Sequence, residues 1–228
     1  MDKSKSLPLA NAAVLLVAFI MYALLVSPLP VMKLAKASSA PVYRWPDGDN
    51  VSPVCVVSWD TSHMGSILEA LDREDARITF AVTGEWALKN ADTAMRIVAE
   101  GQGLALLLGD GTPAAGELLN EAETIRAVSG EAPLIAVCSV KNAEAQAKSC
   151  TEAGLKPIVI SIDLGGSLAR GDALDSLLTG MRPGGCTVGF LPTAEAAGGL
   201  QEFIEKIKNM GYGIVPAHKM LYNYNDKI

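Results

Sequence analysis

The turn at residues 58–63 holds the densest group of side chains that can bind or react with a ligand. It has the sequence Ser-Trp-Asp-Thr-Ser-His and follows an apolar run, 53–57, so it is expected at the end of a strand. Asp60 is a candidate base or metal ligand, and His63, three residues later, is a candidate ligand. Trp59 has two alternative roles: packing in the core, which we favour, and stacking against a sugar ring, for which it is a candidate.

A further candidate, Asp110, lies in a glycine-rich turn after a second apolar run. Together with Asp60 and His63 it provides three groups of the kind that hold a metal ion. The simpler interpretation is that both aspartates are turn residues at strand ends and that His63 caps or begins the next helix. The other histidine, His218, follows Pro216, and we expect it to have a surface or packing role. No Ser-His-Asp or Cys-His catalytic set can be assembled from two histidines placed in this way.

Strand-like and helix-like segments alternate from residue 53 towards the end of the chain. Strands are predicted at 53–59, 77–82, 103–108, 133–139, 156–162, 186–191 and 212–215. Helices are predicted between them, at 64–73, 91–100, 114–129, 142–153, 170–180 and 197–210. Several strands are continuous apolar runs, which is typical of parallel strands buried on both faces. The alternation predicts an α/β fold, and by itself it leaves a doubly wound sheet and a (β/α) barrel nearly equal.

The helix predicted at 91–100 has clear signals at both ends. Asp92 is placed to cap its first amides, and Gly101 is expected to end it. Arg96 and Glu100 are four residues apart, which predicts an ion pair on the helix surface.

Composition limits the classes of partner. Half of the 228 residues are apolar, which is enough for one full-sized core. The formal net charge is −6 and the chain has no basic cluster, so it has no feature of a nucleic-acid-binding protein. The same acidity disfavours electrostatic docking onto anionic lipid.

The N-terminal segment predicts an anchor in a lipid bilayer. No charged residue lies between Lys5 and Lys33, and the apolar part is long enough to cross a membrane as a helix. We expect residues 1–30 to form an uncleaved signal anchor, which makes the protein a single-pass cell membrane protein whose C-terminal domain is extracellular. Secretion after cleavage near Ala37 is the alternative.

Residues 31–52 differ in composition from the segments on either side. They contain Pro41, Pro46 and several Ser and Ala residues, and they are expected to form a linker. The remainder, 53–228, is expected to form one domain.

The four cysteines lie at positions 55, 138, 150 and 186. Their spacing matches no zinc site, and most of them fall in or beside apolar runs. Cys55, Cys138, Cys150 and Cys186 are expected to be buried small hydrophobic residues, while one disulfide is the alternative in an oxidising compartment. The sequence does not choose the partners of such a bridge.

Several longer motifs resemble the polysaccharide deacetylases of carbohydrate esterase family 4. The strongest is the segment ITFAVTGEWALKN, and it is followed by RIVAEGQ. The similarity covers about residues 51–221, and the four matching segments lie at 78–90, 96–102, 181–185 and 207–215. The resemblance implies an irregular (β/α) barrel of about seven strands, preceded here by one N-terminal transmembrane helix.

The resemblance also shows where this chain departs from the family. The family's base falls on Asp60, but the metal-binding Asp after it is Thr61, and the two metal-binding histidines fall on Leu107 and Gly111. Members of the family use a divalent metal such as zinc. Leucine and glycine side chains provide no donor atom and a threonine hydroxyl is a poor sole ligand, so no metal cofactor is expected here.

Two further catalytic groups of the family are missing. Its Arg motif falls on 137–139 and its general-acid His falls near 190–192, and neither residue type is present there. Asp60 is therefore expected to be a vestigial base. Asp163 matches a family Asp and is expected to cap a turn, while Trp86 has the same two possible roles as Trp59.

These observations predict a membrane-anchored, deacetylase-like protein that is catalytically inactive and binds a glycan or a protein at the cell envelope. Its expected partner is peptidoglycan, another cell-wall glycan or a membrane protein. Two alternatives stay open: an active, metal-dependent carbohydrate N-deacetylase with rebuilt ligands, and a purely structural envelope protein.

Overall fold

The structure is a computed structural model, which describes residues 40–46, 48–166, 168 and 183–225. These residues belong to one compact unit, Ser38–Ile228. The predicted anchor at 1–30, the possible cleavage site near Ala37 and the helix predicted at 170–180 lie outside the described residues. Within the described ranges, no helix has the length and apolar character needed to span a bilayer.

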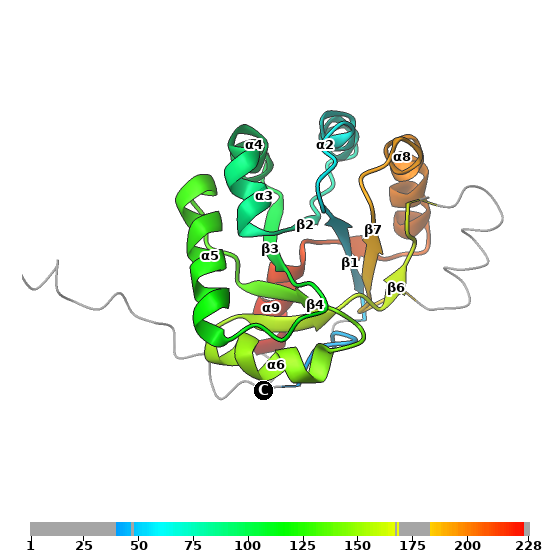
Figure 1. The fold of residues 1–228 in the computed structure, drawn as a ribbon. Helices are drawn as coiled ribbons and strands as arrows, with labels where there is room; N and C mark the ends of the chain where they lie inside the picture. Colours follow the sequence, from blue (N-terminus) through cyan, green and yellow to red (C-terminus); the bar gives the residue numbers. More distant parts are fainter. Residues whose placement is uncertain (1–39, 47, 167, 169–182, 226–228) are drawn as a thin grey trace, which may run out of the picture. The chain divides into compact units, whose positions relative to one another are not determined.

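Parallel strands form the centre of the fold (Figure 1). They are β1 (Asn50–Val56), β2 (Thr79–Val82), β3 (Gly103–Leu107), β4 (Ile135–Cys138), β5 (Lys156–Val159), β6 (Ile162–Asp163), β7 (Thr187–Phe190) and β8 (Gly213–Ile214). Their order in the sheet is β5-β4-β3-β2-β1-β7-β6, with β8 paired to the start of β1. Each predicted strand segment overlaps a strand, and the segment predicted at 156–162 is divided between β5 and β6.

The sheet is curled, and its two edge strands are consecutive in the chain. Only Ile160 and Ser161 separate β5 from β6, so one short connection joins the two edges. The segment 42–45 lies between β5 and the residues that lead into β7. The amide of Val42 donates to the carbonyl of Pro157 at 3.0 Å, and that of Trp45 donates to the carbonyl of Gly185 at 2.8 Å. The predicted α/β fold is therefore confirmed, and the parallel sheet is a curled half-barrel whose edges β5 and β6 are not paired with each other.

Helices connect the strands. They are α2 (Met64–Arg73), α3 (Gly84–Lys89), α4 (Ala91–Ala99), α5 (Ala115–Ser129), α6 (Ala143–Glu152), α8 (Ala194–Asn209) and α9 (Ala217–Asn225). The helices predicted at 64–73, 91–100, 114–129, 142–153 and 197–210 are all present. The sequence analysis missed α9 and also α3, which with six residues is too short to show a full apolar stripe. A local cap marks α3, because the Thr83 hydroxyl accepts a hydrogen bond from the amide of Trp86 at 3.1 Å.

The boundaries of α4 are partly as predicted. Arg96 and Glu100 form the expected ion pair at 2.6 Å, and Gly101 follows the helix with a φ of 75°. The expected cap is wrong, since Asn90 occupies the N-cap position and Asp92 lies inside the first turn. The preceding helix α3 causes this shift: the Asn90 side chain donates to the carbonyl of Trp86 at 2.9 Å and links the two helices.

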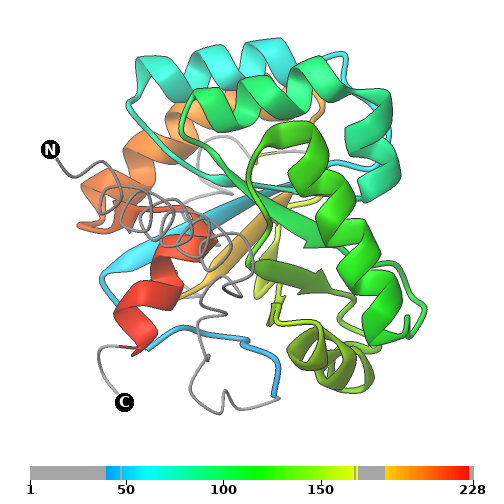
Figure 2. The same cartoon turned by 90° about the vertical axis from the view of Figure 1, so that its left-hand side faces the viewer.

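Apolar side chains pack on both faces of the sheet. Helices lie against the strands (Figure 2). The outer cluster lies between the strands and the helices α2, α3, α4, α5, α6 and α8. The inner cluster contains Trp45 and, from α9, Ala217 and Met220, together with Val54 of β1. Trp45 is only 2% exposed, and β1 begins at Asn50, so the fold begins within the predicted linker at 31–52.

Candidate functional site

Parallel strands end on one side of a sheet, and loops from several strands therefore meet there. We call this side the carboxyl edge. It carries the loops that follow β1 (57–63), β3 (108–114) and β4 (139–142). The candidates Trp59, Asp60 and Asp110 lie on these loops, as the sequence analysis expects, and His63 lies at the end of the first one.

Asp60 forms a local turn. Its Oδ1 accepts a hydrogen bond from the amide of Ser62 at 2.9 Å, and its side chain is exposed. Hydrogen bonds from the side chain and the amide of Ser62 lower the pKa of the Asp60 carboxyl below its usual value. A lower pKa makes the carboxylate a weaker base, which fits a turn residue better than a general base.

The two tryptophans of the family-like motifs have opposite environments. Trp59 is 85% exposed, so the core-packing alternative is wrong for it. Trp86 is 3% exposed and packs in the outer cluster, as the core-packing alternative predicts. His63 is half-buried and occupies the N-cap position of α2 without a side-chain capping bond.

Two more apolar side chains are exposed where strands end. Val140 lies two residues after β4 and is 70% exposed, and Leu191 lies one residue after β7 and is 39% exposed. We call Trp59, Val140 and Leu191 the apolar rim of the carboxyl edge. The sequence analysis missed both residues. Val140 directly follows the strand predicted at 133–139, which was a usable signal, whereas Leu191 lies inside the strand predicted at 186–191.

Asp110 joins two neighbouring loops. Its Oδ1 accepts a hydrogen bond from the Ser139 hydroxyl at 2.7 Å, and its backbone carbonyl accepts one from the side-chain Nδ2 of Asn142. Asp163 forms a turn of its own, because its Oδ1 accepts from the amide of Gly165 at 2.9 Å. The expectations that Asp110 is a turn residue at a strand end and that Asp163 caps a turn are in accord with these bonds.

Gln146 of α6 is the buried group that holds these loops together. It is fully buried, and its Nε2 donates to the carbonyl of Gly109 at 2.7 Å and to that of Gly111. Its Oε1 accepts from the amide of Ser139 at 3.0 Å. The sequence analysis missed this residue, because a glutamine on the buried face of a helix can be recognised only once the partners of the helix are known.

The residues at the family's metal-ligand positions do not fit a divalent cation. Thr61 provides one hydroxyl, and Leu107 is half-buried against the inner cluster. Gly111 is exposed, and a Cβ added there meets nothing within 4 Å. In the part of the chain that the structure describes, no three His, Cys, Asp or Glu side chains are grouped so that they could hold a metal ion. The structure thus does not gather Asp60, His63 and Asp110 into a replacement site.

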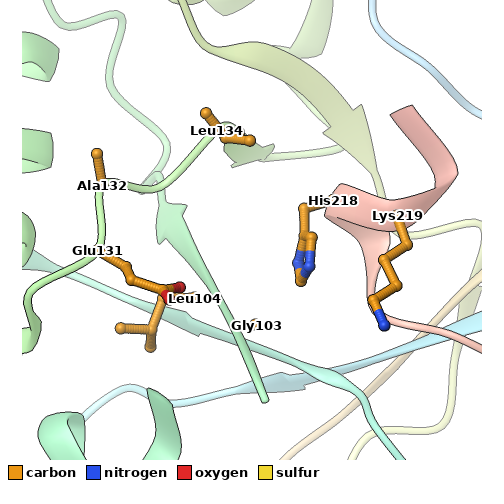
Figure 3. Close-up of a pocket in the computed structure, with 7 residues that line it drawn as sticks. All are labelled: Gly103, Leu104, Glu131, Ala132, Leu134, His218 and Lys219. Atoms are coloured by element: carbon orange, nitrogen blue, oxygen red, sulfur yellow. The ribbon is translucent and has the colours of Figure 1, made fainter. Parts of the chain in front are cut away.

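A separate cavity of about 500 Å³ lies at the amino ends of β3 and β4, on the side away from the carboxyl edge (Figure 3). Its lining includes Gly103, Glu131, His218 and Lys219. His218 is half-buried, and a Cβ added to Gly103 would lie 2.7 Å from its Nδ1, so the imidazole packs directly on the strand. Burial lowers the pKa of His218, which keeps the ring neutral at pH 7. The contact with Gly103 is in accord with the surface or packing role expected for His218.

Similarity to known proteins is found in the structure and not in the sequence. No protein-family model matches the sequence, and no curated protein matches it significantly. The fold is similar to that of BA3943, a CE4 family pseudoenzyme from Bacillus anthracis, with 22% identity and a TM-score of 0.69 over 81% of this chain and 69% of that chain. A mutant of BA3943 with restored enzymatic activity gives 21% identity and a TM-score of 0.70 over 81% and 72% of the two chains.

An enzyme has the same fold. The Bc1960 peptidoglycan N-acetylglucosamine deacetylase is 21% identical, with a TM-score of 0.66 over 79% of this chain and 92% of that chain. The chain therefore has the polysaccharide deacetylase fold of carbohydrate esterase family 4, and it departs from that family's metal-ligand pattern at Thr61, Leu107 and Gly111.

Proposed function

We propose that this protein is a non-catalytic, glycan-binding member of carbohydrate esterase family 4 that is anchored in the cell membrane. Its ligand is a cell-wall polymer of N-acetylated hexosamines, of which peptidoglycan is the main candidate. This ligand class is supported by the similarity of the fold to that of Bc1960, which is a peptidoglycan N-acetylglucosamine deacetylase. The residue types at positions 61, 107 and 111 support the absence of hydrolysis.

The exposure of Trp59 is the observation that carries the binding proposal. A tryptophan that is 85% exposed leaves a large apolar ring in water, which contributes nothing to the core. Such a ring provides a flat apolar face for a sugar ring. Asp60, Asp110 and Asn142 lie on loops of the same edge and offer acceptors and donors for sugar hydroxyl and acetamido groups.

The same edge lacks the groups that amide hydrolysis requires. Water has a pKa roughly twelve units above that of an aspartate, and a bound metal normally closes most of this gap. Asp60 is a weaker base than an ordinary aspartate, since Ser62 lowers its pKa. Thr61, Leu107 and Gly111 provide no ligand set that would activate the water. We therefore propose that the site retains the glycan and leaves the acetamido group intact.

Replacing Trp59 with alanine should weaken binding to purified peptidoglycan and to chitooligosaccharides by about 30-fold. This factor corresponds to roughly 2 kcal/mol, a common loss for a tryptophan at the centre of an interface. Isothermal titration calorimetry and sedimentation with insoluble peptidoglycan measure it. Trp59→Phe should retain part of the affinity, because it keeps an aromatic face.

Met210 provides the matched control for Trp59. It is an apolar side chain, 39% exposed, at the end of α8 and thus at the opposite edge of the sheet. Met210→Ala should bind both glycans as the wild type does. An unchanged affinity in Trp59→Ala, or equal losses in the two variants, would remove the carboxyl edge as the binding surface.

The uncharged N-terminal segment supports the membrane location. Deleting residues 1–37 should move the protein from the membrane fraction to the soluble fraction without lowering the melting temperature of the domain, because the compact unit begins at Ser38. The protein that lacks residues 1–37 should appear in the soluble fraction whether or not it also carries Trp59→Ala. A full-length protein that is recovered in the soluble cytoplasmic fraction would contradict the anchor.

A further inference from the structure

Two buried cysteine sulfurs lie in contact beneath the carboxyl edge. Cys138 is the last residue of β4, and Cys150 lies in α6, the helix that follows this strand. Their Sγ atoms are 4.0 Å apart, and the two residues are 4% and 0% exposed. Adjacent elements thus bring together two of the four cysteines of the chain.

We infer that Cys138 and Cys150 form an intrachain disulfide in the mature protein. A disulfide has an S–S distance of about 2.05 Å, so the two sulfurs must approach by about 2 Å, which rotations of both side chains share. The inference rests on the proposed extracellular location for its oxidant, because disulfides form in oxidising compartments. The geometry of the pair is independent of that location.

The oxidant is a disulfide, either a small molecule or a thiol–disulfide oxidoreductase. One thiolate attacks it, forms a mixed disulfide and releases one thiol. The second cysteine then displaces the other thiol, so two protein thiols lose two electrons and two protons and the oxidant becomes two thiols. Because both sulfurs are buried, the reaction takes place while the chain folds.

The bond would fasten α6 to β4 directly below the candidate site. Ser139, which donates to Asp110, is the next residue after Cys138. Gln146, which holds the loop at 109–111, lies one helical turn before Cys150. The two cysteines are 12 residues apart, and a short loop of this size raises the melting temperature of a domain of about 190 residues by roughly 6–12 °C.

Peptide mapping of the full-length protein tests this inference. Cells that produce the protein with its own N-terminal segment are lysed in N-ethylmaleimide, and the protein is digested with trypsin without reduction. Lys141 and Lys148 lie between the two cysteines, so trypsin separates their peptides unless a disulfide joins them. We expect one cross-linked pair that contains Cys138 and Cys150, with the reagent on Cys55 and Cys186.

Reduction should lower the melting temperature of the wild type and leave that of a C138A/C150A variant unchanged.

Two additional measurements separate this inference from the proposed location. Protease added to intact cells reports whether the domain is outside, and oxidised glutathione added to reduced, unfolded protein during refolding reports whether the pair can close. Free thiols at Cys138 and Cys150 in an extracellular domain, or a different pairing on refolding, would overturn the disulfide. A domain found inside the cell whose pair closes on refolding supports the pairing and contradicts only the location. A C55A/C186A variant is the control, and it should form the same bridge.

Discussion

Replacing Trp45 with alanine should lower the free energy of unfolding by about 3–5 kcal/mol, the usual cost of removing a buried tryptophan. Trp45 is 2% exposed and packs in the inner cluster with Val54 and Met220. Its indole N–H also donates to the hydroxyl of Thr187 at 3.4 Å. The loss therefore combines a cavity inside the curled sheet with a broken contact to β7. Urea denaturation of the domain, followed by tryptophan fluorescence and circular dichroism, measures the change.

The control for Trp45 is a second tryptophan of the same chain. Trp59 is 85% exposed, so Trp59→Ala should change the free energy of unfolding by less than about 0.5 kcal/mol. A protein that starts at residue 53 should fail to fold, because it lacks Trp45 and the start of β1, whereas one that starts at Ser38 should fold. Equal stability of the two tryptophan variants would contradict the placement of residues 42–45 in the fold.

Installing the family's three metal ligands should create a zinc site. The variant T61D/L107H/G111H carries one carboxylate and two imidazoles, a ligand set that zinc accepts. Position 111 has room for the imidazole, since a Cβ there meets nothing within 4 Å, and position 107 is half-buried. We expect zinc affinity to rise at least about a thousandfold over the wild type, because the wild type offers a single hydroxyl at these positions. Isothermal titration calorimetry and the shift of the melting temperature with added zinc measure the gain.

A variant with one ligand fewer provides the control for the zinc site. T61D/L107H/G111F places a ring of similar size at position 111 without a nitrogen donor, and it should lose most of the gained affinity. Retention of the high affinity in this variant would show that zinc binds elsewhere. A wild-type protein that binds zinc as tightly as the triple variant would contradict the proposed non-catalytic function, since the ligands would then come from residues other than 61, 107 and 111.

Most of the fold could be predicted from local patterns. Apolar runs such as 104–108 mark buried parallel strands, and Gly101 marks a helix end, because these signals depend only on neighbouring residues. The choice between a flat sheet and a barrel required the family resemblance. Curling depends on how the edges β5 and β6 meet, and no local pattern encodes that contact.

Two parts of the fold were not predictable from local patterns. The segment at 42–45 has the composition of a linker, and only its contacts with Pro157 and Gly185 show that it belongs to the domain. Gln146 has the sequence context of an ordinary surface helix. Its role depends on Gly109, Gly111 and Ser139, which come from other loops.

The sequence by itself determined which donor atoms the chain lacks, because the identity of the side chains at 61, 107 and 111 does not depend on how they are arranged. Only the tertiary structure decided that Trp59 faces solvent while Trp45 is buried, and that Cys138 lies beside Cys150. Exposure and distance depend on segments that are far apart in the chain, so residues with the same side chain acquire different roles only when the sheet has curled and the helices have packed.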